Sequence, residues 1–306
     1  MKNVDKNYYP GWVRRSITFT IDDGSLVLDR KFIDKVRPYG IKGTFNIPTV
    51  RGSYDEYRAL YSGYGISNHC KLHPYAFKDG EEYILTSEPF DKDTADKDKC
   101  YATAREGVYH YFPEGKAWRT IADAEAYLLL ARENLDELYE IFGRENVHGY
   151  CWPFCRQRNE KIISGLEQMH EWIRGSGYSG SFEVPKNRMD WHYTANYKNL
   201  AEESEKYDTL LDDGELKFFC FGVHAFDFEN NGCWNILEDF VRKLGNRPED
   251  YFYADVHTIF SYADAVEKMS VSESGIDNPT GYDLYITVDG KRRIIPKHSF
   301  VAIENL

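Results

Sequence analysis

The chain has 306 residues, 42% of them hydrophobic, which is enough for one barrel-sized domain with a large buried core and a small appendage. Its formal net charge of −12 argues against nucleic acid as a partner, because polyanions are bound through Lys and Arg clusters. A neutral or cationic carbohydrate or small molecule is easier to accommodate. No run of about 18 apolar residues occurs, so no membrane span is predicted.

The N-terminal segment MKNVDKNYYPGW lacks the apolar core of a secretory signal. This predicts a cytoplasmic location for the chain as given, and an extracytoplasmic one if an export signal has been removed. The six cysteines show no spacing typical of a disulfide scaffold, so they are interpreted as reduced thiols. The oligomeric state does not follow from the sequence.

Strands and helices alternate along the chain. β-Branched and aromatic residues predict strands over residues 16–21, 43–47, 64–68, 147–154, 172–175 and 216–224. Apolar residues at helical spacing predict helices over residues 27–36, 121–142, 234–244 and 259–269. Such alternation indicates the α/β class, with parallel strands joined by helical crossovers.

Two regions lie outside this repeat. Residues 75–119 are charged and rich in tyrosine, and they are too numerous for an ordinary connection. We interpret them as an insertion that forms a lid or contact surface near the site, with an inert excursion as the alternative. Residues 282–296 alternate like a β-hairpin with Asp289 and Gly290 at its turn. The prediction is therefore a barrel over residues 1–270, with the insertion, and a small β-hairpin appendage over residues 271–306.

The most informative residues are Asp22 and Asp23 in TFTIDDG and His69 and His73 in HCKLH. On a helical turn, histidines at i and i+4 face the same way and can share one ion. A carboxylate added to two imidazoles makes a three-ligand site with open positions, which suits a catalytic metal. One aspartate could hold the metal while its neighbour takes a proton. Alone, each motif also fits a plain turn or a solvated helix face.

These two motifs resemble the first and second motifs of the polysaccharide deacetylase family (NodB-type, carbohydrate esterase 4). The resemblance runs from about residue 17 to about residue 271 and implies an irregular (β/α) barrel. It also implies that Asp22 is the general base and that Asp23, His69 and His73 bind a divalent metal. The His2Asp ligand set favours Zn²⁺.

The third and fourth motifs are less complete. The sequence YCWPF resembles the family's RxPY motif, but Cys151 replaces the arginine that pairs with the catalytic aspartate. Arg156, Arg158 or Arg188 could supply that charge. Asp190-Trp191 resembles the fourth motif, in which the carboxylate orients the catalytic pair and the indole walls the groove. The resemblance thus adds Asp190 to the catalytic residues, and the substrate-binding residues it implies are Trp152, Pro153, Phe154 and Trp191.

His224, in FFCFGVHAF, resembles the fifth motif, whose histidine is the general acid that protonates the leaving group. A core histidine is the alternative interpretation. The family usually has a leucine two residues earlier, at the acyl pocket. Gly222 occupies that position here, which predicts a wider or differently lined pocket.

The resulting hypothesis is a metal-dependent hydrolase that removes acetyl groups from N- or O-acetylated sugars. Two alternatives remain open. One is a hydrolase of the same fold that acts on a small non-sugar amide, imide or formamide. The other is a catalytically silent carbohydrate-binding protein.

Overall fold

A computed structural model describes residues 2–76, 85–86, 93–97, 100–103, 107–112, 117–154 and 159–305. Its centre is an eight-stranded sheet in which every pairing is parallel. Seven strands follow the order β12-β11-β10-β4-β3-β2-β13, and β14 pairs with β2. The strands are β2 (Arg15–Asp22), β3 (Thr44–Ile47), β4 (Gly65–Asn68), β10 (Val147–Cys151), β11 (Trp172–Tyr178), β12 (Trp191–Tyr193), β13 (Lys217–His224) and β14 (Tyr251–Tyr253).

The two outer strands of this order, β12 and β13, meet through the residues that follow β12. Ala195 forms a parallel bridge with Phe221, and the Gly222 N–H donates to the Ala195 carbonyl at 2.9 Å. The sheet therefore closes on itself into an irregular barrel. This confirms the predicted fold class, an α/β barrel with an additional β unit at the C-terminus.

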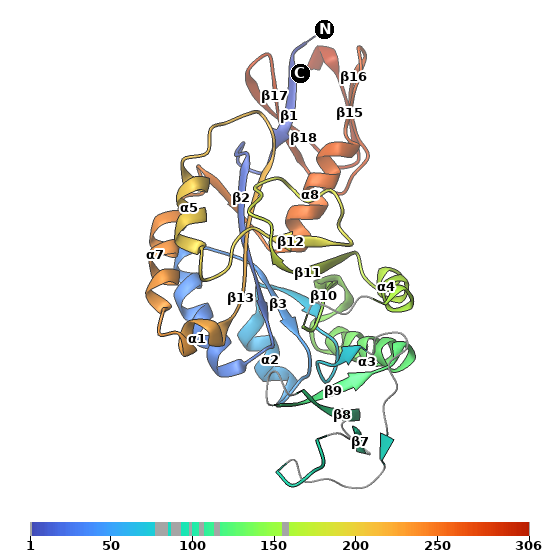
Figure 1. Cartoon of the computed structure of the whole chain (residues 1–306). Helices are drawn as coiled ribbons and strands as arrows, with labels where there is room; N and C mark the ends of the chain where they lie inside the picture. The colour runs from blue at the N-terminus through green and yellow to red at the C-terminus, as the bar shows by residue number, and fades with distance from the viewer. Residues whose placement is uncertain are drawn as a thin grey trace.

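Helices surround the strands (Figure 1). Neighbouring helices contact one another in the order α5, α7, α1, α2, α3, α4, and α8 packs against β2. The helices are α1 (Leu26–Val36), α2 (Tyr54–Tyr61), α3 (Ala124–Phe142), α4 (Glu160–Glu167), α5 (Leu200–Asp208), α6 (Ala225–Asn230), α7 (Trp234–Leu244) and α8 (Val256–Lys268), with 3-10 turns η1 (Arg37–Tyr39), η2 (Arg144–Asn146) and η3 (Ile303–Asn305). None of the helices in the described residues is long and apolar enough to cross a membrane.

The largest core cluster fills the space between the sheet and these helices. Phe19, Phe45 and Phe221 belong to it and are fully buried. Phe19 packs against Phe45 with ring centroids 5.4 Å apart and against Phe221 at 5.9 Å. This aromatic layer between sheet and helices explains the β-branched and aromatic strand residues in the sequence, because each buried ring stabilises the fold by removing apolar area from water.

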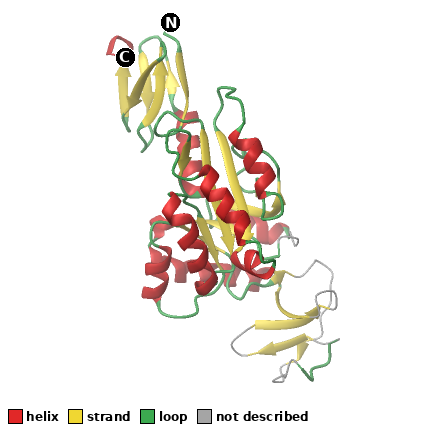
Figure 2. Cartoon of the chain, turned by 90° about the vertical axis from the view of Figure 1, so that its left-hand side faces the viewer, coloured by secondary structure: helices red, strands yellow, loops and turns green. Residues whose placement is uncertain are grey.

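The described part of the insertion forms a sheet of its own with the order β5-β9-β8-β7-β6. Its strands are β5 (Tyr75–Ala76), β6 (Leu85–Thr86), β7 (Cys100–Thr103), β8 (Gly107–Phe112) and β9 (Ala117–Ala122). Strands β7 and β8 lie at the end of the molecule opposite the two chain termini (Figures 1 and 2). The helix predicted over 121–142 begins only at Ala124, because β9 continues to Ala122 and the Asp123 side chain caps α3. The rest of the insertion lies outside the described residues, so its role as a lid stays a prediction.

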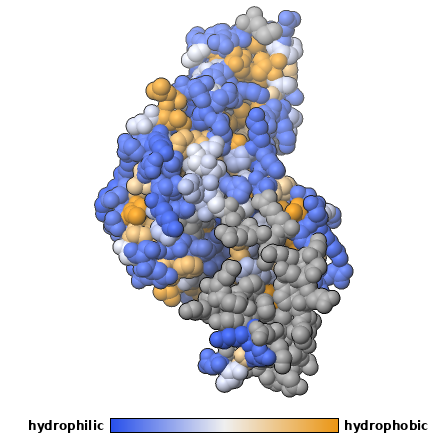
Figure 3. Space-filling model, viewed as in Figure 1, coloured by the Kyte–Doolittle hydropathy of each residue, from blue (hydrophilic) through white to orange (hydrophobic). Residues whose placement is uncertain are grey.

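The C-terminal unit contains the hairpin of β17 (Leu284–Val288) and β18 (Lys291–Ile295). Asp289 and Gly290 at its turn have φ of 49° and 75°, as a type I′ turn requires. The sequence did not indicate that β1 (Val4–Tyr8) pairs with β17. A second sheet contains β15 (Ser270–Val271), β16 (Gly275–Asn278) and β19 (Ser299–Ala302). Several apolar residues are exposed at this end of the face that Figure 3 shows, next to hydrophilic ones.

Candidate active site and metal centre

The candidate residues meet at the carboxyl ends of the parallel strands, where barrels of this kind carry their chemistry. Asp22 ends β2 and pairs in register with His224, which ends β13. His69 directly follows β4. Strand order thus brings together residues that are far apart in the sequence.

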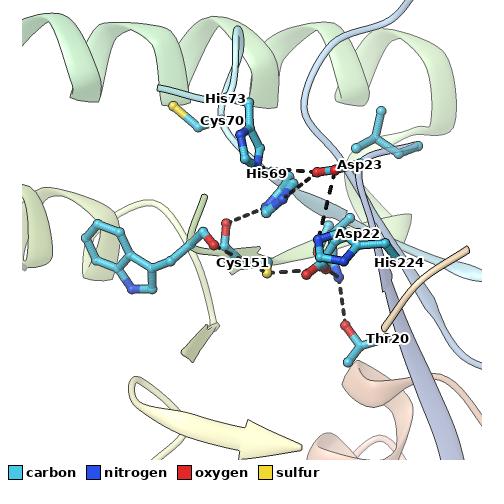
Figure 4. A network of polar contacts seen from close by, with 12 residues as sticks. Thr20, Asp22, Asp23, His69, Cys70, His73, Cys151 and His224 are labelled. Atoms are coloured by element: carbon cyan, nitrogen blue, oxygen red, sulfur yellow. Dashed lines mark hydrogen bonds and ion pairs between the residues drawn. The ribbon is translucent and has the colours of Figure 1, made fainter. Parts of the chain in front are cut away.

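Asp23, His69 and His73 form one group whose possible ligand atoms all lie within 4.8 Å of one another. Asp23 Oδ1 lies 3.3 Å from His69 Nε2 and 3.3 Å from His73 Nε2. Both imidazoles turn toward this carboxylate (Figure 4). His69 is buried, whereas His73 and Asp23 are partly exposed. The group is therefore buried on the side of His69 and accessible to solvent on the side of His73 and Asp23.

The histidines converge through an irregular loop, and the prediction that they share a helical turn is wrong. Cys70, Leu72 and His73 have φ of 58°, 63° and 48°, in the left-handed region. Such residues cost about 1–3 kcal/mol each and persist where their surroundings determine them. The Leu72 N–H donates to Thr49 Oγ1 at 3.0 Å, and the His73 N–H donates to the Cys70 carbonyl at 3.1 Å. These bonds hold the loop in its unusual shape.

The protonation of this group suits a cation. His69 Nδ1 lies 2.8 Å from the Cys151 carbonyl, so Nδ1 carries the hydrogen and Nε2 presents its lone pair to Asp23. Burial lowers the pKa of His73 to about 3, which keeps that imidazole neutral. Asp23 Oδ1 and His69 Nε2 are buried and have no hydrogen bond among the described residues. Facing lone pairs that lack hydrogen-bond partners fit a bound divalent ion.

Asp22 has a different environment, although it is adjacent to Asp23. Arg174 NH2 donates to its two carboxylate oxygens at 2.5 and 2.6 Å. Asn46 Nδ2 donates to Oδ1 at 2.6 Å, and Cys151 Sγ lies 3.4 Å from the same oxygen. Burial alone would raise the pKa of Asp22, but the positive charge of Arg174 outweighs it and holds the pKa below its usual range. Asp22 is therefore an ionised, fully oriented carboxylate.

Arg174 supplies the charge that Cys151 cannot, and the sequence analysis missed it. Its side chain is 1% exposed and reaches Asp22 from β11, the strand paired with β10. Arg188 ion-pairs with Asp264 at 2.8 Å instead. Arg156 and Arg158 lie outside the described residues. The available signal was one charged residue inside the apolar strand sequence WIRG, since a buried arginine requires a carboxylate partner.

His224 lies beside both aspartates. Its Nε2 is 3.9 Å from Asp23 Oδ2, and its Nδ1 is 3.1 Å from Asp227 Oδ2. Burial would lower the pKa of His224, but Asp227 and the charges of Asp22 and Asp23 raise it to about 9. This imidazolium can donate a proton near neutral pH.

Among the predicted substrate-binding residues, Phe154 contacts the metal group. Its ring stacks on Tyr75 at 3.8 Å and meets the His73 ring edge-on at 4.3 Å. Trp152 is buried near Tyr127, and Pro153 is buried beside it.

The fourth-motif residues lie on and just before β12, where Trp191 pairs in register with Arg174 of β11. Trp191 is 1% exposed and packs in the second core cluster against Trp172 and Phe260, so its indole has little surface to offer a groove. Asp190 precedes β12, and its Oδ1 lies 3.8 Å from His192 Nε2. Arg174 and Asn46 donate hydrogen bonds that orient Asp22, and the orienting role of Asp190 stays a prediction.

A cleft of about 490 Å³ borders the metal group. Asp23 and His73 line one part of it, and Arg51 and Tyr57 line another. Of the two alternatives predicted at Gly222, the structure fits a differently lined pocket and not a wider one, because a Cβ there would lie 2.1 Å from the Tyr193 ring. Tyr193 takes the space that a larger side chain would fill.

No model of a known protein family matches the sequence, and no curated protein matches it either. Solved structures with similar folds include the Xyl-CE4 domain of a multidomain xylanase from the hindgut metagenome of Trinervitermes trinervoides. It has 12% identity and a TM-score of 0.47, over 83% of this chain and 92% of that one. The peptidoglycan deacetylase PdaC from Bacillus subtilis has 14% identity and a TM-score of 0.45, over 83% and 92%. The chitin deacetylase from Colletotrichum lindemuthianum has 12% identity and a TM-score of 0.43, over 82% and 87%. The first is described as a CE4 domain, and the other two as deacetylases.

Proposed function

We propose that the chain is a metal-dependent hydrolase that removes acetyl groups from N- or O-acetylated sugars. The observation that carries the proposal is the division of labour between adjacent carboxylates. Asp22 is fully hydrogen-bonded and ionised beside Arg174, whereas Asp23 directs an oxygen without a hydrogen bond at two imidazoles. One carboxylate is positioned to accept a proton, and the other to bind a cation.

In this mechanism, Asp23, His69 and His73 hold the ion, and their two nitrogens and one oxygen favour zinc. When bound, a divalent ion supplies Lewis-acid polarisation of an acyl carbonyl and makes nearby water more acidic. Asp22 accepts the proton of the attacking water, and Arg174 keeps it ionised for that step. His224 then donates a proton to the departing amine or alkoxide, and Asp227 orients its ring. The cleft beside Asp23 and His73 offers room for the sugar.

Acetate release from chitooligosaccharides and acetylated xylan, measured with and without a chelator, tests this function. We expect chelation to stop release and added Zn²⁺ to restore it. Release only from small N-acyl amides would favour the non-sugar hydrolase, because the same residues can cleave either amide. Glycan binding by a metal-free chain that releases no acetate would favour the silent binding protein.

Two variants separate the proposed roles. Asp22→Asn should lower kcat by about 10²–10⁴-fold while metal content by elemental analysis stays unchanged. His69→Ala should lose both metal and activity, because it removes a ligand. His298→Asn, at an exposed histidine outside the site, is the matched control and should change neither. Near-normal turnover in Asp22→Asn would show that Asp22 is not the base.

A further inference from the structure

A second group of possible metal ligands lies at the opposite ends of the barrel strands. His148 is the second residue of β10, Glu171 immediately precedes β11, and His257 is in the first turn of α8. Their possible ligand atoms all lie within 4.8 Å of one another. Three separate segments therefore each bring one possible donor into the same small region, far along the strands from Asp23.

The hydrogen bonds of His148 fix how this group is protonated. Its Nε2 lies 2.8 Å from the Glu145 carbonyl, an acceptor, so Nε2 carries a hydrogen. Its Nδ1 lies 2.9 Å from Glu171 Oε1. In the neutral imidazole this places a lone pair against a carboxylate oxygen. Two such acceptors attract each other only when a cation, either a second proton or a metal ion, lies between them.

His257 adds a second nitrogen to the same carboxylate. Its Nδ1 lies 3.5 Å from Glu171 Oε2, and its ring stacks on His148 with centroids 3.4 Å apart and planes 6° apart. Two imidazolium rings at this spacing would repel, so at most one ring holds a second proton. The lone pairs of two parallel stacked rings do not converge, so one ring must tilt out of the stack for both nitrogens to share an ion with the carboxylate, and both rings are then neutral.

The position suits a structural rather than a catalytic ion. The two imidazoles are mostly buried, with 17% and 22% of their side chains exposed, whereas Glu171 is 62% exposed. Water can therefore complete the coordination from the Glu171 side. The Glu171 N–H also donates to the His148 carbonyl at 2.9 Å, which fixes the two residues relative to each other.

We propose that His148, Glu171 and His257 bind a second divalent ion of the borderline class that includes zinc, nickel and copper. This ion fastens the start of α8 to the adjoining ends of β10 and β11. It takes no part in acetyl removal, so the proposal does not depend on the proposed function.

Metal counting on the full chain, stripped with a chelator and titrated with Zn²⁺, tests the proposal. We expect two ions per chain in the wild type and one in His257→Gln, which should keep its acetate-releasing activity. His69→Ala should also bind one ion, and the double variant none. In the His69→Ala background, Zn²⁺ should raise Tm through the second site alone, and adding His257→Gln should abolish that rise.

Two further variants protect the test from misfolding and nonspecific binding. Glu171→Gln changes a mostly exposed side chain and should weaken the second site at least tenfold without unfolding the protein. His298→Asn should still bind two ions. A wild type that binds one ion, lost in His69→Ala but kept in His257→Gln, would overturn the second site and leave the proposed function standing. A wild type that binds one ion, kept in His69→Ala but lost in His257→Gln, would support the second site and overturn the proposed function.

Discussion

Asp22 and Asp23 are neighbours in the chain, but the barrel interior around Asp22 and the loop around Asp23 hold the two side chains in different ways. In the barrel interior, a charge holds the side chain: the buried guanidinium of Arg174 contacts both carboxylate oxygens of Asp22. The loop uses backbone conformation. Cys70, Leu72 and His73 are all left-handed there, as is Asp23 itself with φ of 75°.

The contrast shows how adjacent identical residues can take opposite roles. Asp22 ends an extended strand, and its side chain points into the barrel interior, where it meets Arg174 of β11. The left-handed backbone at Asp23 turns the next side chain away, toward the histidines. The positive charge of Arg174 favours an ionised Asp22, which can act as a base. The neutral imidazoles of the loop leave their lone pairs free to bind a cation. Each half can be perturbed separately.

The largest expected effect, on both stability and the pKa of Asp22, is that of removing Arg174. Arg174→Met would leave the Asp22 carboxylate buried without its cation, which should lower the free energy of unfolding by about 3–5 kcal/mol. It should also raise the pKa of Asp22, so the acid limb of the pH–rate profile should move to higher pH. Denaturant unfolding and kcat/KM measured against pH check both effects.

Arg188→Met is the matched control, because its guanidinium pairs with Asp264 and not with the site. It should leave the pH–rate profile unchanged. Arg174→Lys keeps the charge but not the planar donor group, so we expect an intermediate result. An Arg174→Met enzyme with a wild-type acid limb would contradict the view that this arginine keeps Asp22 ionised.

Much of this arrangement could be predicted from the sequence. The alternating strands and helices indicated the α/β barrel, because parallel strands need helical crossovers. Helix α7 follows the predicted residues 234–244, where apolar spacing is regular. The short strands β12 and β14 were not predicted, because an alternating pattern cannot be recognised in three residues.

The limits were sharper at the site. Strand ends placed Asp22, His69 and His224 near one another, but spacing alone suggested a helical turn for the histidines. Left-handed conformations at non-glycine residues leave no pattern in the sequence. Arg174 was missed because its partner, Asp22, is 152 positions away and only strand order brings them together.

The loop that carries His69 and His73 is supported by hydrogen bonds between uncharged groups. One of these groups is the imidazole of His170, so protonation of His170 should disturb the loop. Asn68 Oδ1 accepts from the Cys70 N–H at 2.9 Å, and Asn68 Nδ2 lies 3.1 Å from His170 Nε2. His170 Nδ1 lies 3.0 Å from the Leu166 carbonyl, so Nδ1 carries the hydrogen and Nε2 accepts. A proton on Nε2 would face the Asn68 amide hydrogens. Burial accordingly lowers the pKa of His170 to about 4.

His170 should therefore make folding sensitive to acid. An unfolded histidine takes up its proton near pH 6.5, and the folded one only near pH 4, so stability falls as pH drops through this window. The contribution is about 3 kcal/mol. In His170→Gln, the loss of unfolding free energy between pH 7 and 4 should be smaller by about that amount. Equal losses in the two proteins, measured by urea unfolding, would mean that His170 does not titrate in this way.

The smallest expected effect lies where the two halves meet, at His224. Asp227→Asn keeps an acceptor for the His224 N–H, which donates to Asp227 Oδ2 at 2.9 Å, but removes the negative charge beside the ring. The pKa of His224, raised to about 9 in part by Asp227, should fall. Because the protonated ring is the donor, activity is lost as pH rises through this pKa. The alkaline limb of kcat should therefore move to lower pH, with a loss of about tenfold above the new limb and little change below it. Asp239→Asn, at a carboxylate paired with Arg242 on the exposed face of α7, should leave the limb in place. A uniform loss of kcat at every pH would instead mean that Asp227 positions the ring without setting its charge.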